Sequence, residues 1–279
     1  MTPAILTASG VATDIGQRRS LNEDAALASA PCFLVADGMG GHDSGDVAAA
    51  TAVSAFQRFA GRASLTVDEV RDAIDEVRAC LEEFSEGHAG GAGTTLSGVA
   101  VADVRGEGYW MVLNVGDSRT YRLQDGSLTQ LTVDHSLVQE MIEQGVLTPE
   151  AARRDQRRNV VTRALGASSN GVADTWMLPA HRGDRILVCS DGLSDELTHE
   201  RIEQILLTER DPQVAATLLV HEAHHTGGRD NITAIVVDAV DVTHAAPTGD
   251  DDVEIATLDR GADGSVDTRP RSAVTGSGS

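Results

Sequence analysis

Residues 35–46 read VADGMGGHDSGD and continue the apolar run PCFLVA, which covers residues 31–36. Three aspartates, four glycines, one serine and one histidine fall among these twelve positions. A short apolar run that ends at glycine is typical of a buried β-strand. Such a strand fixes the position of Asp37, and the glycine that follows lets other groups approach the backbone closely. The stretch therefore predicts a buried strand that delivers a carboxylate to a site at its end.

Three more apolar segments carry an aspartate at one end. They are LVCSDG with Asp191, LNVGDSR with Asp117, and GGRDNIT with Asp230, which opens a strand. One Asp-Gly pair alone would be an ordinary turn. Several carboxylates brought together, however, repel one another unless they are protonated or bridged by a cation. Oxygen ligands favour Mg²⁺ or Mn²⁺ over zinc, so the four strand ends predict a divalent metal site.

Composition excludes several classes of function. The chain has 279 residues and a formal net charge of -21, so we expect neither nucleic acid nor an anionic membrane as a partner. The N-terminus lacks a basic segment followed by an apolar one, and no apolar stretch approaches the roughly 18 residues of a membrane span. These features predict a cytoplasmic location. Cys32, Cys80 and Cys189 match neither a disulfide framework nor a zinc ribbon.

Strands dominate the part of the chain that carries periodic structure, residues 1 to about 240. Apolar runs predict strands at 31–36, 94–104, 109–115, 185–190 and 232–240. Residues 119–132, RTYRLQDGSLTQLT, predict a β-hairpin, because Asp-Gly suits the positive dihedral angles of a tight turn. Short turns between neighbouring strands favour antiparallel pairing. Residues 241–279 are polar and acidic, which predicts a disordered tail.

Helices are expected in blocks between the strands. The stretch TVDE at 66–69 is a capping box, with Thr66 as the cap and Glu69 three residues later. Apolar residues after it recur at helical spacing and predict a buried face of Val70, Ile74, Val77, Leu81 and Phe84. Further helices are predicted at 44–60 (with Ser44 or Asp46 as cap), about 136–145, after Pro149, and at about 199–208 and 212–226. Separate groups of strands and helices indicate an α+β layered domain.

Eight motifs occur in a fixed order along the chain. They are DIGQRRSLNEDA (14–25), VADGMGGHDSGD (35–46), GTT (93–95), NVGDSRTYRL (114–123), LTVDHS (131–136), NVVTRALG (159–166), CSDGLSD (189–195) and GGRDNIT (227–233). In this order and spacing, from about residue 8 to 240, the chain resembles the metal-dependent protein serine/threonine phosphatases of type 2C, the PPM family, in their bacterial form. The resemblance implies a four-layer sandwich of two packed antiparallel sheets, with helices on both outer faces.

The resemblance also implies a set of metal ligands. Asp37 would bridge two Mn²⁺ or Mg²⁺ ions, the backbone carbonyl of Gly38 would bind one of them, and Asp191 and Asp230 would complete the shell. The same resemblance implies that Glu23 and Asp24 would hold metal-bound waters. It also implies that Asp117 would hold a third, looser ion together with Asp191.

Substrate-binding positions follow from the same motifs. Arg19 would grip the substrate phosphate, since a guanidinium matches phosphate oxygens bidentately. His42 would lie near the leaving group, where a histidine can give a proton. Residues 137–158 would form a flap beside the site, and its arginine cluster, ARRDQRRN at 152–159, either contacts the substrate or forms a solvated basic face.

The implied reaction is hydrolysis of phosphoserine and phosphothreonine in proteins by a metal-activated water. Phosphorylated proteins would be the partners, with bacterial Ser/Thr kinases as counterparts, and the chain would act as a monomer. One departure from the family pattern is Asp46, which stands where the bacterial members usually have glutamate.

Two alternative functions compete with this interpretation. HEAHH at 221–225 satisfies the H-E-x-x-H pattern of zinc metallopeptidases, in which two histidines on one helix face bind zinc and the glutamate acts as general base. The position of a third ligand, however, holds Asn231 instead of histidine or aspartate. The other alternative is a catalytically weak relative that only binds phosphoproteins. Such relatives typically lose metal ligands, whereas Asp37, Asp191 and Asp230 are all present here.

Overall fold

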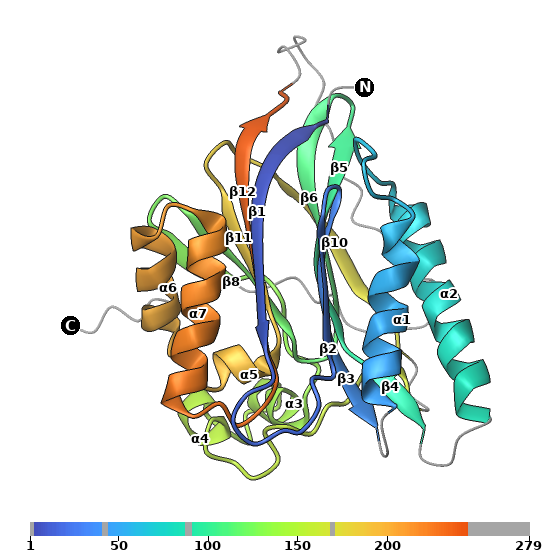
Figure 1. Cartoon of the computed structure of the whole chain (residues 1–279), viewed down its shortest axis with the longest axis vertical. Helices are drawn as coiled ribbons and strands as arrows, with labels where there is room; N and C mark the ends of the chain where they lie inside the picture. The colour runs from blue at the N-terminus through green and yellow to red at the C-terminus, as the bar shows by residue number, and fades with distance from the viewer. Residues whose placement is uncertain (1–2, 41–43, 87–90, 168–170, 245–279) are drawn as a thin grey trace.

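Two antiparallel sheets lie face to face at the centre of the protein, and helices cover their outer faces (Figure 1). The computed structural model describes residues 3–40, 44–86, 91–167 and 171–244. The first sheet has the order β1 (Ile5–Asp14), β12 (Ile232–Val242), β11 (Arg185–Cys189), β7 (Arg119–Gln124) and β8 (Ser127–Gln130). The second has the order β10 (Asp174–Pro179), β6 (Glu107–Val115), β5 (Leu96–Val104), β3 (Cys32–Gly40), β4 (Ala92–Thr94) and β9 (Leu165–Gly166), with β2 (Asp24–Ser29) paired to β3. The predicted α+β class with antiparallel sheets is confirmed.

The sequence of β3 is a continuous apolar run, instead of an alternating one, because both faces of the strand are buried. Because successive side chains of a strand point to opposite faces, Phe33 and Val35 enter the apolar core between the two sheets. Leu34 and Ala36 enter the second core, beneath the helices that cover this sheet. Both faces of β3 are therefore buried, and the strand is held on each side before it reaches Asp37.

Four helices form the outer layers. Helices α1 (Gly45–Gln57) and α2 (Val67–Glu86) cover the second sheet, and α6 (His199–Thr208) and α7 (Pro212–Thr226) cover the first (Figure 1). The predicted buried face of α2 is confirmed, with Phe84 only partly buried at its end. Thr66 and Glu69 form the predicted capping box, in which the Glu69 N–H donates to Thr66 Oγ1 at 3.3 Å and the Thr66 N–H donates to Glu69 Oε2 at 2.9 Å.

Helix α1 begins differently from the expectation. Ser44 occupies the N-cap position, but its side chain makes no capping hydrogen bond. The side chain of Asp46 instead accepts a hydrogen bond from the Val47 N–H at 2.8 Å. Neither predicted residue therefore caps the helix in the usual way. The positions before Ser44, including His42 and Asp43, lie outside the described residues, as does 245–279 of the predicted tail.

The predicted tight hairpin is confirmed, whereas several strands of the structure were not predicted. Asp125 and Gly126 join β7 to β8 with φ angles of 51° and 81°. The strands that were not predicted are β1, β2, β9 and β10, and the predicted strand at 94–104 includes only the last residue of β4. Strand β1 lies at the edge of its sheet, and many of its residues are exposed or half-buried, so it carries too little apolar periodicity to be recognised. Its pairing with β12 over its whole length is a long-range interaction.

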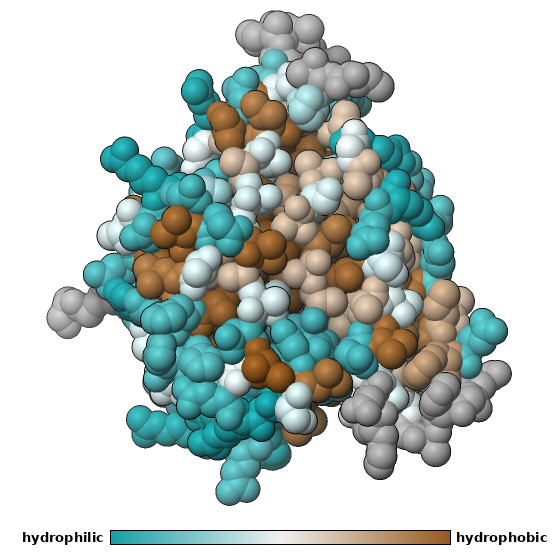
Figure 2. All heavy atoms as spheres, in the orientation of Figure 1, coloured by the Kyte–Doolittle hydropathy of each residue, from teal (hydrophilic) through white to brown (hydrophobic). Residues whose placement is uncertain are grey.

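The flap region contains two short helices, α3 (Leu137–Glu143) and α4 (Pro149–Ala152). Hydrophilic residues dominate the surface around α4, at the end of the molecule where β3 stops (Figures 1 and 2). A third short helix, α5 (Asp191–Ser194), follows β11 and was not predicted. Among the described residues, no helix combines the length and apolar character that crossing a bilayer requires.

Arg185 is a buried arginine of β11 that holds the end of α6 to the first sheet. Its guanidinium donates to the two carboxylate oxygens of Asp238 at 2.6 and 2.7 Å. It also donates to the backbone carbonyls of Leu206 at 2.8 Å, of Arg210 at 2.6 Å and of Glu209. The last carbonyls of a helix have no partner within it, so one side chain satisfies the end of α6 and neutralises a carboxylate.

We expect Arg185→Met to lower the free energy of unfolding by about 3 kcal/mol, because it leaves Asp238 and the carbonyls at the end of α6 without their donor. Urea denaturation followed by circular dichroism measures this loss. The matched control is Arg71→Met, whose partner Asp68 lies on the exposed face of α2; its cost should stay within about 0.5 kcal/mol. Equal losses in the two variants would show that Arg185 has no special structural role.

Candidate metal and phosphate site

Asp37 lies in β3 with its backbone held from both sides. Its N–H donates to Thr95 Oγ1 at 2.9 Å, and its carbonyl accepts from Thr94 Oγ1 at 3.0 Å and from the Thr95 N–H at 2.9 Å. The strand does not end at this residue, as the sequence suggested. It continues to Gly40, because Gly38 to Gly40 pair with β4. Asp37 is thus fixed within a sheet, which orients its carboxylate more firmly than a loop would.

Gly38 marks a crossing of three chain segments. A Cβ atom at this position would lie 2.1 Å from the carbonyl oxygen of Gly45 and 2.7 Å from that of Glu23. The Gly38 N–H donates to the Glu23 carbonyl at 3.1 Å. No larger residue fits here without moving the start of α1 or the segment that carries Glu23. The glycine therefore brings the neighbouring segments close to Asp37.

Carboxylates from separate elements gather around Asp37. Asp24, the first residue of β2, is its direct partner in the antiparallel register. Asp191 is the first residue of α5 and follows β11, Asp117 follows β6, and Asp230 precedes β12. The predicted acidic positions therefore come from both sheets and converge at one end of the sandwich.

Burial and mutual repulsion raise the pKa of four of these carboxyls. Burial, followed by the charges of Asp24 and Asp191, raises the pKa of Asp37 well above its ordinary value. Burial and then the charge of Asp117 raise the pKa of Asp191 in the same way. Mainly through burial, the pKa of Asp24 rises to about 6 and that of Asp117 to about 7. Negative charge at this end of the sheets is thus costly to the folded protein.

Two buried oxygens in this group fit a role as cation ligands. Oδ1 of Asp24 and Oδ1 of Asp191 are buried and have no hydrogen-bond partner, although buried polar atoms are nearly always paired. Across the described ranges, no three Asp, Glu, His or Cys side chains lie close enough to form a ready chelate. Charged carboxylates repel one another, and a cation between them would remove that repulsion. The all-oxygen donor set fits Mg²⁺ or Mn²⁺.

Arg19 lies at the rim of the acidic group. Its Nη2 donates to Asp230 Oδ2 at 2.7 Å, and its Nη1 lies 3.8 Å from Glu23 Oε2. The hydrogen bond to Asp230 raises the pKa of Arg19. Burial raises the pKa of Glu23 while the charge of Arg19 lowers it. Because 47% of the Arg19 side chain is exposed, the guanidinium is both anchored to the acidic group and accessible to an anion.

Asn231 supports the site structurally, a role that its sequence context did not predict. It is buried, and its Nδ2 donates to the carbonyls of Ile15 and Leu21 at 2.9 Å each. Its Oδ1 accepts from the Glu23 N–H at 2.8 Å. One amide therefore fixes both ends of the segment that carries Arg19. The only signal in the sequence was its place directly after Asp230.

Ser190 is a second supporting residue without a clear sequence signal. Its hydroxyl donates to Asp24 Oδ2 at 2.8 Å and accepts from the Thr233 N–H at 3.0 Å. Ser190 thereby orients the Asp24 carboxylate and links β2 of the second sheet to β12 of the first.

The structure does not support the zinc peptidase alternative. Glu222, which would be the general base, is bound by the guanidinium of Arg201 through two hydrogen bonds. Asn231, at the position of the third ligand, uses its amide to hold the 15–23 segment. The HEAHH stretch therefore lacks the free base and the third ligand that this chemistry requires.

Comparisons with known proteins agree with this geometry. The family model of protein phosphatase 2C matches residues 16–222. The serine/threonine phosphatase stp of Listeria welshimeri is 37% identical over 239 residues, which cover 81% of this chain and 93% of the relative. The crystal structure of the Mycobacterium tuberculosis serine/threonine phosphatase PstP/Ppp has a TM-score of 0.77 and 33% identity, covering 83% of this chain and 98% of that one.

A second solved structure bears on the cofactor. The catalytic domain of the serine/threonine phosphatase PstP, in complex with two manganese ions, has a TM-score of 0.74 and 33% identity, with 84% and 99% of the two chains covered. The chain therefore belongs to the protein phosphatase 2C family of metal-dependent protein serine/threonine phosphatases.

Proposed function

We propose that this phosphatase uses two tightly bound Mn²⁺ or Mg²⁺ ions, held by Asp37, the Gly38 carbonyl, Asp191 and Asp230. The observation that carries the proposal is the group of buried carboxyls with raised pKa values, among which Asp191 has an unpartnered buried oxygen. The presence of these ligands together favours an active enzyme over a relative that only binds phosphoproteins. When bound, the ions supply an acidified water and positive charge for the phosphoryl oxygens.

The side chains around this group have distinct proposed roles. Asp24, oriented by Ser190, and Glu23 would hold water molecules of the metal shell. Asp117 and Asp191 would together hold a third, weaker ion. The two carboxyls interact, because the charge of Asp117 raises the pKa of Asp191. Arg19 would exchange its contact with Asp230 for the substrate phosphate, which a guanidinium binds through two parallel hydrogen bonds.

The two buried cysteines, and the serine that follows β11, are not ready to act as nucleophiles. Burial raises the pKa of the Cys189 thiol to about 12 and that of Cys32 to about 12, so neither supplies a thiolate at neutral pH. The Ser190 hydroxyl already donates to Asp24. Water is therefore the proposed nucleophile. His42 would protonate the leaving oxygen, a role that rests on the resemblance alone.

The flap proposal is supported by one contact with the acidic group. Arg158 Nε lies 3.4 Å from Asp195 Oδ2, and the charge of Asp195 helps to raise the pKa of Asp117 and of Asp191. We place the phosphatase domain at residues 1 to about 240, with its flap at about 137–158 and the tail after it. Because β12 continues to Val242 and pairs there with β1, the tail begins after that residue and not at 241. Its proposed partners are phosphoproteins made by Ser/Thr kinases, and we expect it to act as a monomer.

Asp37→Asn tests the metal site directly. We expect it to reduce the hydrolysis of p-nitrophenyl phosphate and of a phosphothreonine peptide at least about 100-fold. Substituting a residue that only supports a metal ligand costs up to about 100-fold, and losing a bridging ligand itself should cost more. Wild-type activity should require Mn²⁺ or Mg²⁺ and vanish in EDTA. Asp72→Asn, on the exposed side of α2, is the matched control and should keep full activity. Unchanged turnover in Asp37→Asn, or in EDTA, would disprove the proposal.

The raised pKa values predict an unusual pH dependence of the metal-free protein. Asp24 and Asp117 have folded-state pKa values of about 6 and about 7 against an ordinary 3.8, so the folded state binds more protons than the unfolded one. The contribution of each group to the free energy of unfolding is therefore greatest below about pH 4. It falls as the pH rises through the folded-state pKa, by on the order of 3 kcal/mol for each group. Acids with lowered pKa values, such as Glu69, titrate below this window.

Urea denaturation in EDTA at pH 5 and pH 8 measures this effect. We expect the metal-free protein to be less stable at pH 8, and saturating Mn²⁺ to flatten or reverse the trend, because the ion binds the deprotonated carboxylates. Asp117→Asn should reduce the slope in EDTA. A metal-free protein that gains stability between pH 5 and pH 8 would contradict the assignment of raised pKa values to this group.

Arg19→Ala separates phosphate binding from chemistry. If the guanidinium grips the phosphate equally in the ground state and the transition state, KM should rise by roughly tenfold or more while kcat changes less. Steady-state kinetics with the phosphothreonine peptide provide both constants. Arg18→Ala, the exposed neighbour, is the control and should leave both nearly unchanged. A fall in kcat at constant KM would instead assign Arg19 a role confined to the transition state.

A further inference from the structure

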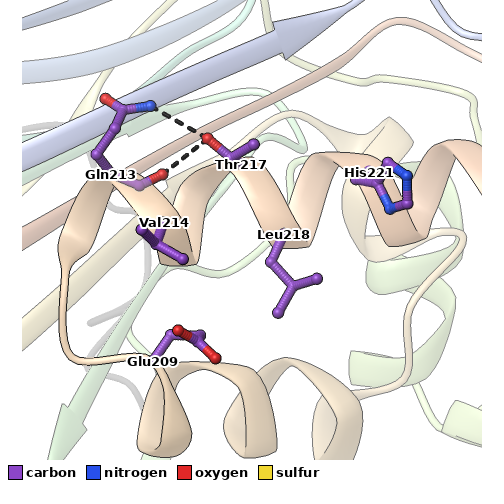
Figure 3. Close-up of a pocket in the computed structure, with 6 residues that line it drawn as sticks. All are labelled: Glu209, Gln213, Val214, Thr217, Leu218 and His221. Atoms are coloured by element: carbon purple, nitrogen blue, oxygen red, sulfur yellow. Dashed lines mark hydrogen bonds between the residues drawn. The ribbon is translucent and has the colours of Figure 1, made fainter.

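Helix α7 carries a pair of histidines that the phosphatase site does not use. His221 and His225 are both exposed and lie one helical turn apart, with their Nε2 atoms 3.1 Å from each other. Their rings are 4.3 Å apart between centroids and inclined by 66°. Leu219 and Ala223 lie on the buried face of α7, so packing fixes the outward direction of the histidine face. Figure 3 shows the ring of His221 projecting from α7 beyond Leu218.

We propose that His221 and His225 form a two-histidine binding site for a borderline transition-metal ion, Cu²⁺ or Ni²⁺. Imidazole nitrogens suit these ions, whereas the acidic group around Asp37 offers only oxygen. Residues i and i+4 of a helix share one face, and the two Nε2 atoms already point toward each other. In the metal-free pair, one Nε2 carries a proton and donates it in the hydrogen bond to the other Nε2. To bind an ion, that ring moves its proton to Nδ1, so that both Nε2 atoms are free ligands and both imidazoles stay neutral.

The distance between the two nitrogens is short enough for one ion to bind both of them. Two nitrogens 3.1 Å apart, each about 2.1 Å from one ion, subtend an angle of about 95° at that ion. Neighbouring ligands of a square-planar or octahedral ion are about 90° apart, whereas tetrahedral ligands at the same bond length would be about 3.4 Å apart. One Cu²⁺ or Ni²⁺ ion can therefore bind both nitrogens at adjacent positions of a tetragonal coordination sphere.

The neighbouring side chains leave the other coordination positions to water. Glu222 is held by Arg201. His224, on the same turn, is directed to Asp14, whose Oδ1 lies 2.9 Å from its Nδ1. No third Asp, Glu, His or Cys completes a chelate among the described residues. The site is thus bidentate and open, and Cu²⁺ should bind most tightly because it forms the strongest complexes of the divalent first-row ions.

The location of the pair links it to the phosphate-binding segment. Gln17 donates from its side chain to the His224 carbonyl at 2.6 Å and from its N–H to the Gly228 carbonyl at 2.7 Å. These bonds attach the segment that carries Arg19 to the last turn of α7. An ion shared by His221 and His225 would brace that same turn.

The test uses the full chain without a polyhistidine tag, in saturating Mg²⁺ to occupy the oxygen-rich site. Calorimetric titration with Cu²⁺ should show one bound ion, and electron paramagnetic resonance should show coupling to two imidazole nitrogens. His221→Ala and His225→Ala should each weaken Cu²⁺ binding at least roughly tenfold, since even supporting residues of metal sites cost that much. Both positions are exposed, and circular dichroism would verify that the variants fold.

Two further variants give the experiment its specificity. His224→Gln should bind Cu²⁺ as the wild type does, because its ring is directed to Asp14. Asp37→Asn should also retain the nitrogen-coupled signal, which would show that the ion is not in the phosphatase site. The proposal is overturned if nitrogen coupling is absent, if the double variant His221→Ala/His225→Ala binds as the wild type does, or if His224→Gln abolishes binding.

Discussion

Repulsion between buried carboxylates is the constraint on which the arrangement of this protein depends. Besides burial, the charges of Asp24 and Asp191 raise the pKa of Asp37, and the charge of Asp117 raises the pKa of Asp191. The folded chain therefore carries an electrostatic cost at one end of its sheets. Only a rigid framework keeps such groups together. The two apolar cores against β3 and the hydroxyls of Thr94 and Thr95 provide that framework, and a divalent cation converts the cost into binding energy.

The supporting residues show how the two sheets cooperate. Ser190 connects the Asp24 carboxylate to the backbone of Thr233, and Asn231 holds the segment of Arg19 against the start of β12. Each is a buried polar group whose hydrogen bonds are fulfilled across elements distant in the sequence. The phosphatase site thus belongs to neither sheet alone, which explains why its ligands come from so many separate motifs.

Much of the framework was readable from local patterns, whereas the supporting contacts were not. The spacing of Val70 to Phe84 indicated the buried face of α2, and Asp125 with Gly126 indicated the hairpin, because both signals are local. Asp37, Asp117 and Asp191 were found because they follow apolar runs, and Asp230 because it precedes one, whereas Glu23 and Asp24 were expected only from the resemblance to the family. Strand β1 and the role of Asn231 were missed, since an edge strand has weak periodicity and an amide's distant partners leave no trace in spacing.

The pairing of β1 with β12 has a consequence for how the protein is made. Ile5 lies opposite Val242, and the bond from the Glu23 N–H to Asn231 spans 208 residues. Contacts this distant in sequence close late in folding, and a ribosome releases the N-terminal strand long before its partner. The nascent chain therefore cannot complete the acidic group around Asp37, to which Asp230 belongs, until its last strand emerges. We expect dephosphorylation to begin only after the whole domain has been synthesised.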